Sequence, residues 1–185
     1  MPFIHTFDDS CSLQSGSIPS ELVPDGTTFE ALWNLHPKEH SIIVIHGKRV
    51  AVPRWEQAYG KDYAFSNQTA VALKIPEQFT PYLDWARAEI EPRLNGIFVN
   101  WHDGAKKHYH GKHRDSTKGI VAGTPIVTIS LGEERVFRMR PHPSGSPKQD
   151  FMLENGDYVV IPWETNQNWS HEVPKSRSTK ACGYR

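Results

Sequence analysis

Two histidines and one aspartate have the residue types and the spacing of a mononuclear metal site. His113 and Asp115 form an H-x-D pair, and His171 lies far downstream in the segment NWSHEVP. Because side chains alternate along an extended chain, His113 and Asp115 point to the same side and can bind one ion. A triad of two histidines and one carboxylate holds Fe(II) on one face and leaves the opposite face open to a cosubstrate and dioxygen. Zinc is the chemical alternative in the same site.

The composition is typical of a single globular domain and argues against several classes of protein. The 185 residues include 21 Lys and Arg and 21 Asp and Glu, so binding to a polyanion would have to rest on a local patch. Cys11 and Cys182 do not form a disulfide framework of the secreted kind. The N-terminus has no signal-peptide core, and no apolar run has the length of a membrane span. We therefore expect a monomer that does not bind membranes and resides in the cytoplasm or, in a eukaryote, the nucleus.

The elements that must position the triad are predicted to be helical before residue 95 and β-rich after it. Residues 1–26 are polar and turn-rich, and we expect them to form a loosely packed arm. Apolar residues at helical spacing predict helices over 27–36 and 78–94. Between these helices, residues 41–54 predict two short strands around His46-Gly47-Lys48.

Short apolar runs separated by turn residues fill the rest of the chain. These runs are IFVNW, TPIVTISLG, RVFRMR, FMLE and DYVVIPW. Strands this short and this evenly spaced are typical of a sandwich or a jelly roll. The sequence therefore predicts an α+β fold that is mainly β.

A series of short motifs from residue 44 onward occurs in the order known from one protein family. The motifs are Gly47-Lys48 leading to VPR, AYG, YAFS, VNWHDG, HRD, TPIVTISLG, FRMR, NGDYVVIP, TNQNWSHEVP and the terminal Tyr184-Arg185. In these motifs the chain resembles the AlkB family of 2-oxoglutarate- and Fe(II)-dependent oxygenases, notably its nucleic-acid demethylases. The resemblance implies a double-stranded β-helix, or jelly roll, flanked by N-terminal helices. It implies one oxygenase domain over 27–185, in which 27–95 form the helices and a substrate lid and 96–185 form the jelly-roll core.

The resemblance also implies two cofactors and their ligands. Fe(II) would be bound by the triad of His113, Asp115 and His171. The distal carboxylate of 2-oxoglutarate would be bound by Arg185, whose planar guanidinium matches a carboxylate and keeps its charge. Asn100 matches a cosubstrate contact of the family, and His102 replaces the tyrosine that the family usually has at that position.

The C-terminus departs from the family pattern. In the family, the arginine matched by Arg185 begins a last strand that carries a second arginine, and we expect this strand to be truncated or lost. A less favoured alignment makes Arg177 the first arginine and Arg185 the second.

Several residues are candidates for substrate contacts. The resemblance places Tyr63 and Phe65 at a flipped-out base and Arg54 and Tyr59 in the flanking lid, whereas spacing alone favours core strand packing for the two aromatic residues. Arg138 and Arg140 alternate on one strand and so lie on the same face of it. From there they would either contact a backbone phosphate or remain exterior charges of the jelly roll.

Two further features concern the substrate. The basic run 106–114 borders the proposed metal site. It would either contact phosphates of a substrate or form a solvated loop. Ser116 stands where demethylating relatives often have an acid.

Three functions remain open from the sequence. The leading one is an Fe(II)- and 2-oxoglutarate-dependent dioxygenase that demethylates N-alkylated bases in DNA or RNA, with release of formaldehyde, succinate and CO2. The first alternative is an oxygenase of the same fold that hydroxylates a small molecule, a lipid or a protein side chain. The second is a catalytically impaired relative that binds nucleic acid.

Overall fold

The computed structural model describes residues 2–65 and 68–175 and is built mainly from strands. Its strands are β1 (Phe3–Thr6), β2 (Ser12–Ser17), β3 (Ile42–Ile45), β4 (Lys48–Ala51), β5 (Trp55–Tyr59), β6 (Tyr63–Phe65), β7 (Gln68–Ala70), β8 (Ile97–Trp101), β9 (His110–His113), β10 (Ile126–Ile129), β11 (Arg135–Pro141), β12 (Gln149–Leu153), β13 (Asp157–Ile161) and β14 (Trp169–Val173). Its helices are α1 (Gly26–Trp33), α2 (Thr80–Glu89), α3 (Trp163–Asn168) and the 3-10 turns η1 (Ser20–Leu22) and η2 (Glu77–Phe79). The prediction of a mainly β protein with few helices is confirmed.

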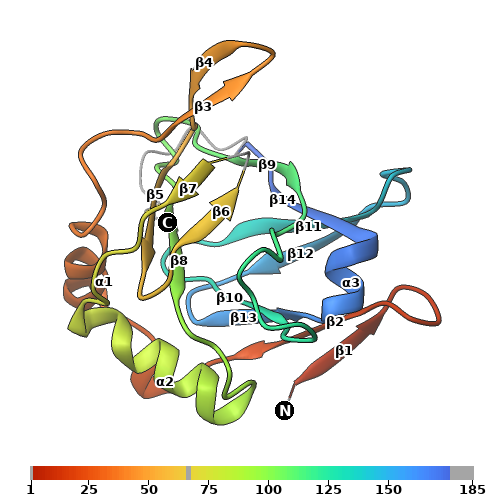
Figure 1. Cartoon of the computed structure of the whole chain (residues 1–185). Coiled ribbons are helices and arrows are strands. Elements are labelled where there is room, and N and C mark those ends of the chain that lie inside the picture. Colours follow the sequence, from red (N-terminus) through yellow and green to blue (C-terminus); the bar gives the residue numbers. More distant parts are fainter. Residues whose placement is uncertain (1, 66–67, 176–185) are drawn as a thin grey trace.

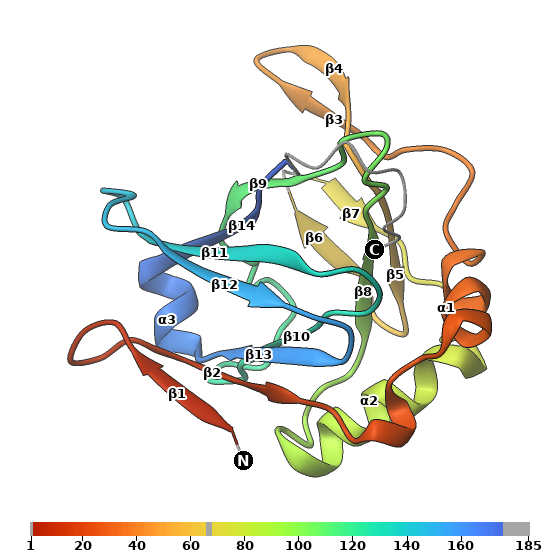
Figure 2. The same cartoon turned by 180° about the vertical axis from the view of Figure 1, so that it is seen from behind.

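Two four-stranded sheets lie one above the other in the body of the molecule (Figures 1 and 2). One has the strand order β1-β2-β13-β10, and the other has the order β12-β11-β14-β9. Apolar side chains from both sheets form a core that includes Leu13, Phe137, Met139 and Ile161. Burial of this apolar surface drives the two sheets together.

Strand β13 is buried on both of its faces and links two cores. Val159 belongs to the core between the sheets, whereas Tyr158 and Val160 belong to a second core with Trp101 and Tyr82. The sequence of this strand is therefore a nearly continuous apolar run, as expected for a strand that is covered on both sides.

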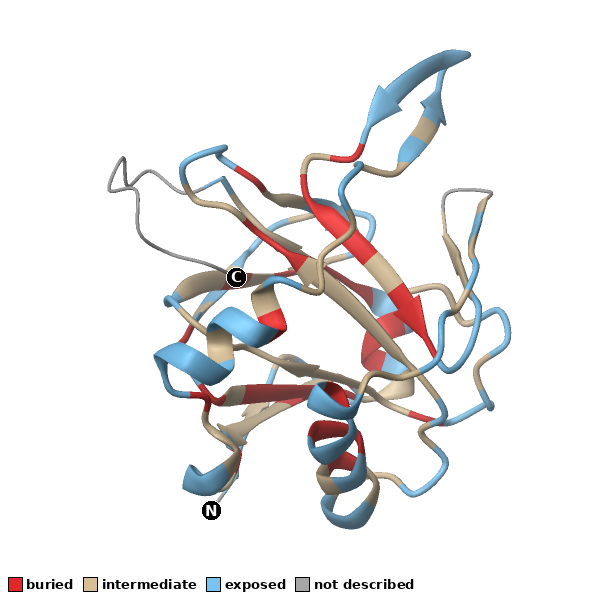
Figure 3. Cartoon of the chain, turned by 90° about the vertical axis from the view of Figure 1, so that its left-hand side faces the viewer, coloured by how far each residue is buried: buried red, intermediate tan, exposed pale blue. Residues whose placement is uncertain are grey.

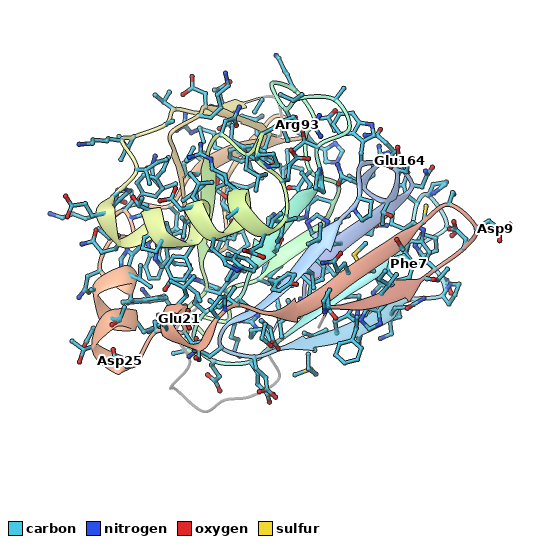
Figure 4. The ribbon with its side chains drawn as sticks, turned by 90° about the horizontal axis from the view of Figure 1, so that it is seen from below. Phe7, Asp9, Glu21, Asp25, Arg93 and Glu164 are labelled. Carbon is cyan, nitrogen blue, oxygen red and sulfur yellow. The ribbon has the colours of Figure 1, made fainter. Side chains whose placement is uncertain are left out.

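Helices α1 and α2 pack at one end of the sheets, and α3 lies at the opposite side (Figure 2). Asp25 lies at the start of α1 (Figure 4). It caps this helix, because its side chain accepts a hydrogen bond from the backbone N–H of Thr28 at 2.8 Å. Pro81 lies in the first turn of α2, where a missing N–H is tolerated. Both predicted helices are present, each shorter than its apolar pattern. No helix of the described segments has the length and apolarity to cross a membrane.

The prediction of a loosely packed N-terminal arm is wrong. Strand β2 pairs with β13 in the first sheet, with Ser15 opposite Val159, and Leu13 is fully buried between the sheets. Gly16 lets the Tyr158 ring lie against the backbone, since a Cβ there would be 2.8 Å from its hydroxyl. The polar composition of this segment gave no sequence pattern that would predict β2, because within that strand only Leu13 is a buried apolar residue.

The hairpin β3–β4 projects from the body of the molecule (Figure 1), and most of it is exposed (Figure 3). His46 and Gly47 connect its strands with φ angles of 47° and 76°. Two consecutive positive φ angles are the signature of a tight two-residue hairpin turn. The two short strands predicted around this turn are confirmed.

We predict that Leu13→Ala destabilises the whole protein, because Leu13 fills the space between the two sheets. The expected loss in the free energy of unfolding is about 3 kcal/mol, measured by urea denaturation. Gln14→Ala, on the opposite face of the same strand, is the control. A loss below about 1 kcal/mol for Leu13→Ala would show that β2 is dispensable for the fold.

Candidate metal centre

The three residues of the predicted triad converge at one end of the second sheet. His113 ends β9, and His171 lies directly opposite it in β14. Asp115 follows two residues after β9, and one ligand atom from each side chain lies within 4.8 Å of the others. The structure therefore brings together the H-x-D pair and the distant histidine.

Hydrogen bonding and stacking fix the two imidazole rings. His113 Nδ1 lies 2.8 Å from the carbonyl oxygen of Gly111, so it carries the proton and leaves the Nε2 lone pair facing Asp115. His171 Nε2 lies 3.4 Å from Asp115 Oδ2, and the His171 ring stacks on Phe137 with centroids 5.3 Å apart. Both histidines thus direct Nε2 toward the same carboxylate.

The backbone of Asp115 is held by a side chain that sequence reasoning missed. Asn166, on α3, accepts a hydrogen bond from the Asp115 N–H at 3.0 Å and donates one to the Asp115 carbonyl oxygen at 3.0 Å. Asn166 is itself buried. Asn166 lies five residues before His171 in the motif TNQNWSHEVP, and this position was the sequence signal that could have identified it.

Tyr63 holds the carboxylate of Asp115. Its hydroxyl donates to Asp115 Oδ1 at 2.8 Å and accepts from the backbone N–H of Ser116 at 3.3 Å. Burial and the adjacent Asp115 charge raise the pKa of Tyr63, so the hydroxyl keeps its proton and remains a donor. A metal ligand held in this way keeps its orientation without the ion.

The protonation states suit a divalent cation. Burial opposes ionisation of Asp115, but His171, His113 and the Tyr63 hydroxyl outweigh it and hold the pKa of this carboxyl below its ordinary value. Burial and the neighbouring His113 lower the pKa of His171 to about 4, partly offset by Asp115. An ionised carboxylate and a neutral imidazole are the forms that bind metal at neutral pH.

The triad opens into a cavity of about 840 Å³ with an aromatic wall. The Tyr63 ring lies 4.5 Å from the Phe98 ring and 6.1 Å from the Phe65 ring, nearly parallel to the latter. All three residues line the cavity. Phe98 was not predicted, although it alternates with Asn100 on β8 and so shares its face.

A polar wall of the cavity contains Arg54, Asn100 and His102. Arg54 and His102 are buried. The guanidinium of Arg54 donates through Nε to Asn100 Oδ1 at 2.5 Å and forms an ion pair with Glu56 at 2.7 Å. Arg185 lies outside the described residues.

Two predicted substrate contacts do not line the cavity. Tyr59 lies in the core formed with the helices, where its hydroxyl donates to the Leu35 carbonyl oxygen at 3.5 Å. Arg138 is bound by Asp150 at 2.5 Å and by Glu172 at 3.4 Å. The structure therefore gives no support for a substrate contact by either residue.

Two cations of the basic run 106–114 are already engaged by the protein. The Lys106 ammonium lies over the Trp55 ring, 4.2 Å from its centroid. The Arg114 guanidinium donates to the Gln167 carbonyl oxygen at 2.6 Å. Neither group is a free phosphate ligand in this conformation.

Comparison with known proteins gives the family. The 2OG-Fe(II) oxygenase superfamily matches residues 36–184. This chain belongs to that family. The family is named for Fe(II) and 2-oxoglutarate, which are therefore its cofactors.

The most similar relatives include human "DNA oxidative demethylase ALKBH2", which is 27% identical over 75% of this chain and 57% of its own length. Rat "Alpha-ketoglutarate-dependent dioxygenase alkB homolog 3" is 24% identical over 66% of this chain and 45% of its own length. This chain thus spans about half the length of these relatives. The solved structure of OsALKBH1 superposes with a TM-score of 0.58 and 16% identity over 97% of this chain and 90% of that one, which shows a common fold.

We predict that Tyr63→Phe weakens metal binding, because it removes the hydroxyl that holds Asp115 while keeping the ring. Loss of such an outer hydrogen bond typically lowers metal affinity by about 10–100-fold, measurable by anaerobic titration with Fe(II). Tyr59→Phe is the matched control, since its hydroxyl donates to the Leu35 backbone carbonyl in the core and does not contact the triad. Equal affinities of the two variants would contradict a role for Tyr63 at the metal.

Proposed function

We propose that this protein is an Fe(II)- and 2-oxoglutarate-dependent dioxygenase that oxidatively demethylates N-alkylated bases in DNA or RNA. The reaction would release formaldehyde, succinate and CO2. The observation that carries the proposal is a candidate metal triad that lines the same cavity as the aromatic residues Tyr63, Phe65 and Phe98. The names of the similar ALKBH2 proteins, which are DNA oxidative demethylases, support the same substrate class.

We assign His113, Asp115 and His171 as the iron ligands. Two imidazoles and one carboxylate are the donor set of non-haem Fe(II) oxygenases, and three protein ligands leave coordination positions for a cosubstrate. Bound Fe(II), with 2-oxoglutarate and dioxygen, supplies the oxidation of the methyl carbon. The protein's part is to hold the donors in place through Gly111, Asn166 and Tyr63.

We assign the polar wall of the cavity to 2-oxoglutarate. Asn100 and His102 line the same cavity as the triad, and an amide N–H and a ring N–H are both hydrogen-bond donors of the kind that a carboxylate accepts. Arg185 is proposed for the distal carboxylate on the basis of the family resemblance.

The aromatic wall is proposed to hold the base. Stacking on an aromatic side chain is worth about 1–3 kcal/mol per base and tolerates any sequence. A base must leave the helical stack to reach a metal inside a cavity. Tyr63 is part of this wall and also holds Asp115, so a base stacked on the wall would lie next to the metal.

The β3–β4 hairpin is proposed to contact the strand from which the base is taken. Ile45 and Val50 line the cavity and are 45% and 40% exposed, and Val44 is 59% exposed. The neighbouring Lys48 and Arg49 are exposed cations that can contact phosphates. Apolar side chains on a projecting element can enter a nucleic-acid stack and favour an unstacked base.

We infer that the two four-stranded sheets are the two halves of a double-stranded β-helix. The alternation of paired strands between the sheets and the structural likeness to OsALKBH1 support this fold. We propose one domain that extends the predicted 27–185 to include β1 and β2, because β2 pairs with β13.

The proposal is tested with purified protein, Fe(II), 2-oxoglutarate and single-stranded oligonucleotides that carry one N-methylated base. We expect formaldehyde and succinate in equal amounts from the wild type and neither from His171→Ala. Succinate formation unaffected by any oligonucleotide, methylated or not, would favour the small-molecule, lipid or protein hydroxylase. Salt-sensitive oligonucleotide binding without succinate would favour the catalytically impaired relative.

We further predict that Phe65→Ala weakens binding of a methylated oligonucleotide about tenfold, because one stacking face is lost. Affinity for 2-oxoglutarate should not change. Fluorescence anisotropy of a labelled oligonucleotide measures the first quantity, and Val71→Ala, at an exposed site nearby in the chain, is the control. Unchanged anisotropy for Phe65→Ala would remove this residue from the substrate site.

A further inference from the structure

A buried ion pair lies beside the proposed cosubstrate site, and neither of its two residues is an iron ligand or part of the aromatic wall. The side chains of Arg54 and Glu56 are 7% and 1% exposed, and Arg54 Nη2 lies 2.7 Å from Glu56 Oε2. Burial raises the pKa of Glu56 and lowers that of Arg54, and in each case the partner's charge opposes the shift. Because withdrawing two charges from water is costly, such a pair is weak evidence for a stabilising role.

Strand register places this pair against the proposed cosubstrate contact. Strands β5 and β8 are antiparallel, and Glu56 lies directly opposite Asn100. Side chains two residues apart share a face, so Arg54, immediately before β5, projects to the same side as Glu56. Its guanidinium Nε then donates to Asn100 Oδ1 at 2.5 Å.

This hydrogen bond decides which way the Asn100 amide faces. A guanidinium has only donors, so the amide atom that faces Nε must be the oxygen. The amide nitrogen is thereby left as the group that Asn100 offers to the cavity, and it has no acceptor among the described residues. A fixed N–H donor of this kind suits a carboxylate ligand, which accepts hydrogen bonds.

We propose that Arg54 and Glu56 are positioning residues that fix the Asn100 amide so that its nitrogen donates to a carboxylate oxygen of 2-oxoglutarate. Glu56 restrains the guanidinium by binding Nη2, and Arg54 Nε in turn restrains Asn100. The inference rests on the proposed function, because it assumes that Asn100 faces the cosubstrate. It replaces the lid contact that the resemblance implied for Arg54.

The test uses Arg54→Lys, which keeps the charge beside Glu56 but removes the Nε donor. Calorimetric titration of 2-oxoglutarate into Mn(II)-loaded protein, where no turnover occurs, measures the cosubstrate affinity. We expect Arg54→Lys and Asn100→Ala each to weaken 2-oxoglutarate binding about tenfold, as for a lost hydrogen bond to a charged group. The double variant should bind no more weakly than Asn100→Ala alone, because both changes remove one interaction.

Two further measurements separate positioning from a general loss of structure. Mn(II) affinity and oligonucleotide affinity should be unchanged in Arg54→Lys. Arg87→Lys is the matched control, since its Nε also donates to an oxygen, the Leu94 carbonyl, and Arg87 itself does not line the cavity. This control should bind 2-oxoglutarate as the wild type does.

Each contrary outcome has a distinct meaning. If the wild type binds 2-oxoglutarate and Arg54→Lys binds it equally well, or the effects of the two single variants add, the positioning role is overturned and the proposed function stands. If Arg54→Lys instead weakens oligonucleotide binding and reduces its salt dependence, Arg54 is a phosphate contact. If the wild type binds Mn(II) but not 2-oxoglutarate, the proposed function itself fails.

Discussion

The antiparallel pairing of β9 with β14 is the constraint on which the rest of the site depends. It sets His171 opposite His113 although a long stretch of chain, including β10 to β13 and α3, separates them. Strand β14 is held in turn by β11, where Met139 lies opposite His171 and is fully buried in the core between the sheets. A slip of one residue would turn each histidine to the other face of the sheet. The metal geometry is thus a consequence of sheet packing.

Around this pairing the protein arranges polar side chains that hold one another in place. Asn166 binds the backbone of Asp115 and Tyr63 binds its carboxylate, so the ligand that lies outside a strand is fixed from two directions. Arg54 and Glu56 form a second such arrangement beside Asn100. Because the low dielectric of the interior strengthens polar contacts, these networks restrict the conformations of their side chains.

The cavity joins these networks to the outside of the molecule. One wall is aromatic, one is polar, and Ile45 and Val50 of the β3–β4 hairpin also line the cavity. The proposed roles divide in the same way, with the cosubstrate on the polar wall, the base on the aromatic wall and the nucleic-acid strand along the hairpin. Tyr63 belongs to both the aromatic wall and the metal site, which places the substrate beside the metal.

The sequence by itself determined the elements that depend on local pattern. The H-x-D spacing, the two helices, the His46-Gly47 hairpin and the series of short strands could all be predicted, because alternation, helical spacing and turn chemistry act over a few residues. The tertiary structure decided what depends on long-range contacts. It put Tyr59 in the core, engaged Arg138 with two carboxylates, turned Arg54 toward Asn100 and brought Asn166 to Asp115. It also drew β2 into the sheet. Residue type gives a side chain its chemistry, but strand register and burial determine which groups it contacts. Register and burial are set only when distant segments pack together.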